Sequence, residues 1–211
     1  MLRRKKAGLR RIEKRIEKRL AMEIFIIRHA PTRSDGGLAG RRDLPCDLPG
    51  AAELAALRGD LRGWIGVPAR LWVSPALRCR TTAGALFPGL SAREDARLWE
   101  QDFGAWEGLP PAEIPDLGPL TGAALARRRP PGGESFADLC KRLRPALKEA
   151  AQGEGPLAVV AHAGTARGAL ALALGSPGRA LGFEIAPLSV TMLRALPGGL
   201  WSVGFVNRLT P

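Results

Sequence analysis

The sequence contains two histidines, His29 and His162, and each directly follows a short apolar run. Residues 23–28 read EIFIIR and residues 157–161 read LAVVA, a pattern typical of strands buried on both faces. Ligands of open α/β sheets bind at the carboxyl ends of such strands. Each histidine is followed by an alanine, which is small enough for the backbone to approach a ligand. A single histidine is more often structural, but two at equivalent strand ends predict a catalytic site.

The rest of the chain alternates between strand and helix patterns. A second buried strand is expected at 71–74, and helices are expected at 51–62, 78–86, 135–151 and 165–174. Two late apolar runs, 189–196 and 201–207, indicate edge strands joined by a Pro-Gly-Gly turn. This alternation predicts an α/β fold, a three-layer α/β/α sandwich with a mostly parallel central sheet.

Four motifs around these elements resemble those of the histidine phosphatase superfamily, also called phosphoglycerate mutase-like. Arg-His-Ala-Pro-Thr occupies residues 28–32, and Ser-Pro-Ala-Leu-Arg occupies residues 74–78. LWEQDFGAWEG covers residues 98–108, and Val-Ala-His-Ala-Gly covers residues 160–164. Their order and spread along the chain make the match specific, whereas Arg-His-Ala alone would be weak. The resemblance implies the phosphoglycerate mutase-like fold and a phosphoric monoester hydrolase.

The resemblance also implies a role for each motif. His29 would be the nucleophile that takes up the phosphoryl group. His162 would complete the pocket, either as a donor to a phosphate oxygen or as a cation beside it. The implied substrate-binding residues are Arg28, Arg78, Thr32 and Ala163. The two arginines would keep the nucleophilic imidazole neutral and grip phosphate oxygens through their bidentate forks.

The leaving alkoxide needs a proton, and the third motif offers carboxylates for this step. Its position in the motif favours Glu100 as the general acid, with Asp102 as the competing candidate. Glu107 is interpreted as a solvated or hydrogen-bonding loop residue. No metal or cofactor is expected, because phosphoryl transfer depends mostly on positioning and on charge stabilisation. The expected partner is a phosphorylated small molecule.

The substrate itself stays open. Residues 40–45, 102–108 and 130–135 together resemble the α-ribazole phosphatase branch, which acts late in cobalamin biosynthesis. The same pieces occur in broad-specificity members of the family. α-Ribazole 5′-phosphate is therefore one candidate, and a broad range of small phosphate esters is the other.

The loop after the nucleophile departs from the family pattern. Family members commonly carry asparagine six residues beyond the nucleophile, where this chain has Asp35. A carboxylate would repel phosphate, so we expect Asp35 to point away or the loop to be rearranged. Arg41 and Arg42 either meet an anionic substrate or belong to a solvated loop.

The first residues differ in composition from the rest. Residues 1–20 hold ten Lys or Arg and two Glu, so they supply most of the net charge of +12. We divide the chain into a basic N-terminal extension, 1–21, helical or disordered, and a histidine phosphatase domain, 22–211. Such an extension suits nucleic acid or an anionic membrane surface, but a solvated tail or translation starting at Met22 is the favoured interpretation.

Other functions find less support in the sequence. No cysteine is followed by arginine six residues later, and there is no Gly-Lys-Ser/Thr phosphate loop or Gly-x-Ser-x-Gly elbow. A phosphoglycerate-type mutase is the alternative within the fold. A non-catalytic module that binds nucleic acid or membrane through its tail is the alternative of another class. Three cysteines without a close pair indicate a reducing compartment, so we expect a cytoplasmic protein.

Overall fold

The computed structural model describes residues 21–34 and 36–209. The predicted extension lies outside this part of the chain except for Ala21, and the expectation for Asp35 lies outside it as well. Within the described residues, no helix has both the length and the apolar character needed to cross a membrane.

Six strands form a single sheet in the order β3-β2-β4-β1-β5-β6. They are β1 (Met22–Arg28), β2 (Arg70–Val73), β3 (Ala92–Glu94), β4 (Leu157–Ala161), β5 (Val190–Leu196) and β6 (Leu200–Arg208). The pairs β1 with β4, β2 with β4 and β2 with β3 are parallel, whereas β5 runs antiparallel to both its neighbours. The predicted α/β class with a mostly parallel sheet is confirmed.

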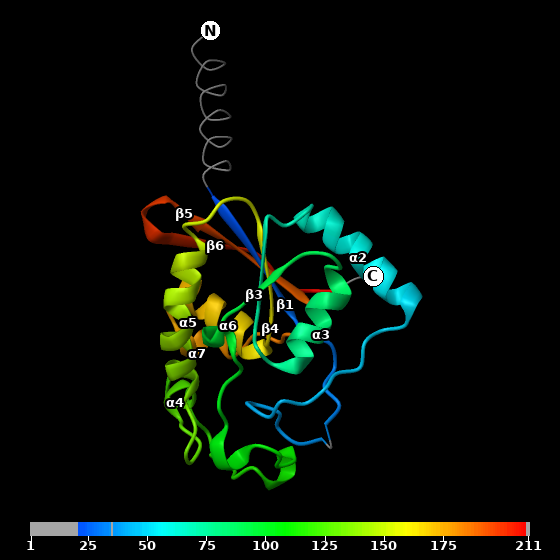
Figure 1. Cartoon of the computed structure of the whole chain (residues 1–211). Coiled ribbons are helices and arrows are strands. Elements are labelled where there is room, and N and C mark those ends of the chain that lie inside the picture. Colours follow the sequence, from blue (N-terminus) through cyan, green and yellow to red (C-terminus); the bar gives the residue numbers. More distant parts are fainter. Residues whose placement is uncertain (1–20, 35, 210–211) are drawn as a thin grey trace.

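Helices cover both faces of this sheet (Figure 1). They are α2 (Ala51–Ile65), α3 (Leu77–Leu86), α4 (Gly122–Arg127), α5 (Phe136–Ala150), α6 (Ala163–Leu174) and α7 (Pro177–Ala180). Helices α2 and α3 lie on one face, and α4 to α7 lie on the other. The expected start of α5 is confirmed, because Ser135 and Asp138 form a capping box at its N-terminus.

The central strands explain this two-sided packing. Alternate side chains of a strand point to opposite faces of the sheet. In β1, Ile24 and Ile26 therefore pack against α5 and α6, while Phe25 and Ile27 pack against α2 and α3. A strand covered on both faces has apolar residues at successive positions, which is why β1 and β4 read as continuous apolar runs.

Three short elements were not expected from the sequence, namely β3, α4 and α7. β3 has three exposed residues, and α7 has four residues. Elements this short contain too few positions to display a period. The loops that matter for the site gather at one end of the sheet, below the carboxyl end of β1 (Figure 1). They are the first loop, residues 29–50, and the acid loop, residues 99–109.

Candidate active site

His29 and His162 lie side by side at this end of the sheet. The register of the parallel pair β1 and β4 sets Arg28 opposite Ala161, so the next residue of each strand is a histidine. The His29 amide also donates to the Ala161 carbonyl over 2.9 Å. The two rings are 5.2 Å apart between centroids and inclined at 69°. The strand register therefore brings together the two histidines, as the sequence predicted.

His29 is buried as a neutral imidazole. Its Nδ1 lies 2.6 Å from the Ala30 carbonyl oxygen. Because a carbonyl can only accept, Nδ1 carries the proton and Nε2 keeps its lone pair. The pKa of His29 is lowered to about 3, first by burial and then by the charges of Arg78 and Arg28, while the hydrogen bond to Ala30 opposes this shift. The ring is thus held in the protonation state that a nucleophile requires.

His162 is completely buried, and both of its ring nitrogens are engaged. Its Nδ1 lies 3.3 Å from Nη2 of Arg78, and its Nε2 lies 2.8 Å from Oγ of Ser74. Since a guanidinium only donates, Nδ1 accepts and Nε2 carries the proton. Burial, then the neighbouring His29 and Arg78, lowers the pKa of His162 well below its ordinary value. Of the two states expected for His162, this environment favours the neutral ring over the cation.

The two arginines lie beside the histidines and keep part of their hydrogen-bonding capacity unused. Arg78 is 1% exposed and donates to the Gly40 and Arg42 carbonyls, each over 2.7 Å. Arg28 donates to the Ile185 carbonyl over 2.6 Å. Within the described residues, the Nε atom of each arginine is buried without an acceptor. A buried donor without a partner is costly, and an anion bound here would supply one.

Glu100 reaches the same place from the acid loop. One carboxylate oxygen accepts from the amide of Gly164, two residues after His162, over 3.2 Å, and the other accepts from the Gln101 amide over 2.9 Å. A Cβ at position 164 would lie 2.0 Å from Oε1 of Glu100, so glycine lets the carboxylate approach this closely. Asp102 instead accepts from the Gly104 amide, within its own turn. Of the two acid candidates, the geometry brings Glu100 to the histidines.

Arg142, on α5, fixes the backbone that carries Glu100. It donates to the carbonyls of Arg97, Trp99 and Glu100 at 2.7, 3.1 and 3.3 Å. Its Nη2 also lies 2.5 Å from a carboxylate oxygen of Glu134, so its charge is paired. A planar guanidinium can hold several acceptors at once, which lysine cannot. Arg142 therefore links α5 to the start of the acid loop.

The first loop and the acid loop are joined through their backbones. The Leu38 amide donates to the Leu109 carbonyl, and the Gly108 amide donates to the Leu38 carbonyl. Glu107 accepts from the amides of Arg41 and Phe103 over 2.7 and 3.2 Å. The interpretation of Glu107 as a hydrogen-bonding loop residue is confirmed. The two loops consequently form one wall of the site.

Two expected substrate-binding residues occupy the border of this cluster. Thr32 forms an isolated β-bridge with Cys46, and Ala163 is the first residue of α6. Their part in binding stays a prediction. Two contributors were missed, Ser74 and Arg142. Ser74 follows β2 directly, so the strand-end rule that identified the histidines also applies to it, whereas Arg142 gives no comparable signal because it lies in an ordinary amphipathic helix.

Comparison with known proteins gives a family and a set of relatives. The model of the histidine phosphatase superfamily (branch 1) matches residues 24–208. A glucosyl-3-phosphoglycerate phosphatase of Mycolicibacterium vanbaalenii is 32% identical over 179 residues, 73% of this chain and 75% of that protein. A bifunctional protein of Mycobacterium tuberculosis is 34% identical over 132 residues, 57% of this chain. The chain spans only 35% of the length of that relative.

Solved structures agree with this picture. The native structure of a mycobacterial glucosyl-3-phosphoglycerate phosphatase superposes with a TM-score of 0.77 at 27% identity, covering 90% of this chain and all of that one. A candidate α-ribazole-5′-P phosphatase of Escherichia coli superposes with a TM-score of 0.73 at 19% identity, covering 89% of this chain and 96% of that one. The second likeness is one of fold alone.

Proposed function

We propose that this chain, which belongs to the histidine phosphatase superfamily, hydrolyses phosphomonoesters through a phosphohistidine formed on His29. One observation carries the proposal. The buried ring of His29 bonds the Ala30 carbonyl through Nδ1, and it lies 5.2 Å from the ring of His162. This leaves Nε2 unprotonated beside a second imidazole and two arginines, which suits attack on a phosphate ester.

The reaction proceeds in two balanced steps. In the first, the lone pair on Nε2 of His29 forms a bond to phosphorus while the bond from phosphorus to the ester oxygen breaks. Glu100 gives its proton to the departing alkoxide. In the second, the Glu100 carboxylate takes a proton from water as the water oxygen attacks phosphorus. The bond from phosphorus to nitrogen then breaks, and inorganic phosphate leaves.

Arg28, Arg78 and His162 stabilise the phosphoryl group as it moves between oxygen and nitrogen. The charge of this group is spread over three oxygens in the transition state, so donors on several sides lower the barrier. The buried Nε atoms of the two arginines support this role, since each needs an acceptor. Thr32 and Ala163 are proposed to border the bound ester.

The identity of the ester has two sources of support of unequal strength. Segments of the chain resemble the α-ribazole phosphatase branch, but the solved structure with that description is similar in fold alone. Relatives described as glucosyl-3-phosphoglycerate phosphatases are similar in sequence over most of the chain. We therefore place phosphoglycerate esters first among the substrates and keep α-ribazole 5′-phosphate as the second candidate.

Phosphate release from a panel of esters tests the proposal. The purified chain should release phosphate from at least one ester of the panel, and His29→Ala should release none. Adding a bisphosphorylated cofactor distinguishes the mutase, which would isomerise a phosphoglycerate instead of releasing phosphate. Full activity in His29→Ala contradicts the proposal. Binding to nucleic acid that weakens with salt and is lost on deleting residues 1–21, without any hydrolysis, would favour the non-catalytic module.

The cytoplasm is the proposed compartment. Cys46, Cys79 and Cys140 are all free, and Cys46 and Cys79 are buried beside the site. Burial raises the pKa of the Cys79 thiol, so this group stays protonated next to His162. Reduced cysteines in these positions support a reducing environment.

A further inference from the structure

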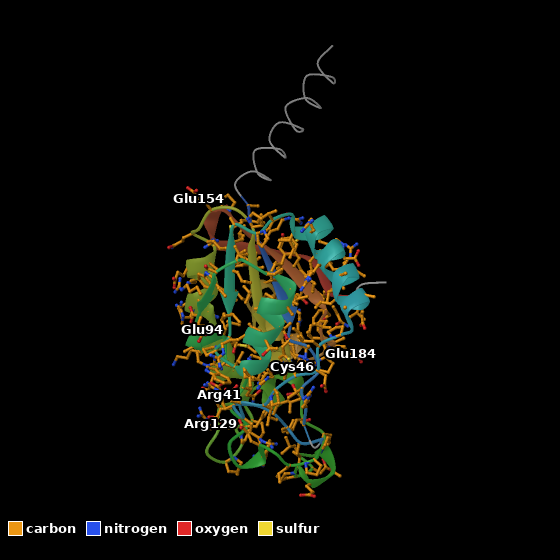
Figure 2. The ribbon with its side chains drawn as sticks, turned by 45° about the vertical axis from the view of Figure 1, so that its right-hand side comes forward. Arg41, Cys46, Glu94, Arg129, Glu154 and Glu184 are labelled. Carbon is orange, nitrogen blue, oxygen red and sulfur yellow. The ribbon has the colours of Figure 1, made fainter. Side chains whose placement is uncertain are left out.

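Arg41 lies next to the candidate active site but takes no part in the phosphoryl chemistry. Its guanidinium carbon is 5.5 Å from the centre of the Trp99 ring. The Trp99 ring is in turn stacked on His162, with 6.2 Å between centroids and 9° between planes. The Trp99 ring therefore contacts both the Arg41 guanidinium and the ring of His162. Figure 2 shows it at the end of the molecule opposite Glu154, on the side of the first loop and the acid loop.

The backbone around Arg41 is held from three directions. Arg78 donates to the carbonyl on either side of it, those of Gly40 and Arg42. The Arg41 amide donates to Glu107 of the acid loop. Because the same Arg78 side chain also contacts His162, the placement of Arg41 depends directly on the catalytic cluster. The backbone that carries the Arg41 side chain is thus fixed before a ligand binds, which lowers the cost of binding.

The charge of Arg41 is only weakly compensated. In the part of the chain that the structure describes, Arg41 is paired with the carboxylate of Glu134, with 3.7 Å between Nη2 and Oε1. Glu134 is already paired with Arg142 at 2.5 Å, so the three side chains together carry one positive charge in excess. The Nε atom of Arg41 is buried without an acceptor in the described part of the chain. The side chain is also 34% exposed, so a ligand in the site can reach it.

A second arginine over a tryptophan shows what a purely structural arrangement looks like here. Arg93 lies 4.4 Å from the ring centre of Trp72. Its Nη1 pairs with Glu149 over 2.6 Å, and its Nη2 lies 3.5 Å from Asp95. Arg93 and Arg97 together share these two carboxylates, so their charges balance. Arg41 and Arg142 have only Glu134 between them. The difference indicates that the missing anion at Arg41 comes from a ligand.

We propose that Arg41 binds a carboxylate of the substrate, so that the preferred substrates are phosphate esters of hydroxy acids. The inference rests on the proposed function, because it places the ester phosphate at His29. A carboxylate two carbons from the phosphate-bearing carbon would extend along Trp99 toward the guanidinium, which can bind it in a bidentate manner. The phosphoglycerate esters named for the sequence relatives carry such a group.

Two esters that differ in one group test the subsite. 3-Phosphoglycerate carries a carboxylate where glycerol 3-phosphate carries a hydroxymethyl group. The wild-type chain should show the higher kcat/KM with 3-phosphoglycerate. Arg41→Gln should lower that value by roughly 10- to 100-fold and change the value for glycerol 3-phosphate by less than about 3-fold. Arg41→Lys should restore part of the preference, since it keeps the charge without the fork.

Arg93→Gln is the matched control, because it removes an arginine from a tryptophan face outside the site. It should leave the ratio between the two esters unchanged. An Arg41→Gln variant that keeps the wild-type ratio would overturn the subsite, and so would an equal loss on both esters.

Calorimetric binding separates a failure of the subsite from a failure of the proposed function. In a His29→Ala background no phosphohistidine can form, so both esters can be titrated without turnover. There, 3-phosphoglycerate should bind more tightly than glycerol 3-phosphate, and adding Arg41→Gln should remove the difference. Equal binding of the two esters, or binding of neither, overturns the subsite. A preserved difference without hydrolysis by the wild-type chain refutes the proposed function alone.

Discussion

The Nδ1 atom of His29 lies 2.6 Å from the carbonyl oxygen of Ala30, at the point where β1 runs into the first loop. This hydrogen bond fixes the tautomer of a buried ring whose pKa is lowered to about 3. His162 is buried and has a lowered pKa for the same leading reason. The arrangement proposed to prepare His29 as a nucleophile therefore has a consequence for folding, which can be measured without a substrate.

Acidification should begin to destabilise the fold at a pH above the range in which carboxylates titrate. Between about pH 6.5 and about pH 3 the unfolded chain protonates His29 while the folded chain does not, so the unfolded state binds more protons. The free energy of unfolding should therefore fall as the pH drops through this window, by up to about 1.4 kcal/mol per pH unit for each histidine involved. Urea unfolding at a series of pH values measures the slope.

A His29→Gln variant is the control for this dependence, since glutamine does not titrate. Its unfolding free energy should fall less steeply over the same range, with His162 accounting for part of the slope that persists. If wild type and variant show the same slope, the ring of His29 is not held neutral by the fold.

The loss of activity on replacing Glu100 should depend on how strongly the leaving group of the ester needs a proton. With an alkyl phosphate, Glu100→Gln should lower kcat/KM by roughly 100- to 10,000-fold. With p-nitrophenyl phosphate, Glu100→Gln should keep most of the wild-type kcat/KM, because nitrophenolate leaves without a proton. The value of kcat/KM reports only the steps up to the release of nitrophenolate. Stopped-flow release of nitrophenol should show a burst, because hydrolysis of the phosphohistidine also uses Glu100.

Asp102→Asn serves as the comparison, since Asp102 bonds within its own turn. It should lower kcat/KM by less than about tenfold on either ester. A larger loss from Asp102→Asn than from Glu100→Gln would exchange the two roles. An equal loss on both esters in Glu100→Gln would mean that Glu100 does not protonate the leaving group.

Arg142 should influence both activity and stability although it touches no reacting atom. Arg142→Met keeps much of the volume but removes the donors to three carbonyls at and just before the start of the acid loop, and it leaves Glu134 without its close partner. We expect a loss of about 2–4 kcal/mol in unfolding free energy and at least about a tenfold fall in kcat. Chemical denaturation and steady-state kinetics measure the two effects.

Arg144→Met is the matched control, because Arg144 is exposed on the same helix. It should change the unfolding free energy by no more than about 0.5 kcal/mol and leave kcat unchanged. A wild-type kcat in Arg142→Met would show that the acid loop holds its shape without this residue.

The parts of the site that the sequence predicted follow from local rules. His29 and His162 stand out because a buried strand is recognisable from its apolar run, and the end of a parallel strand is where a ligand binds. The same rule applies to Ser74, which follows β2 and bonds His162. The sheet order beyond the paired strands was not predictable, because β3 is too short and too polar to show a pattern.

The parts that were missed depend on contacts between segments far apart in the chain. Arg142 reaches carbonyls more than forty positions earlier, and its helix has the same amphipathic pattern with or without that contact. The surroundings of Arg41 depend on where the first loop meets the acid loop. The residues next to it in the sequence therefore could not distinguish a substrate-binding arginine from one in a solvated loop. The neutral state of His162 likewise depends on its complete burial, which a sequence pattern does not measure.

The most direct test of the whole account is to trap the covalent intermediate. Wild-type chain is mixed with labelled phosphate ester and quenched rapidly in either alkali or acid. Protein-bound label should survive the alkaline quench, disappear in acid and be absent from His29→Ala. No alkali-stable label in the wild type, or label that persists in His29→Ala, would contradict it.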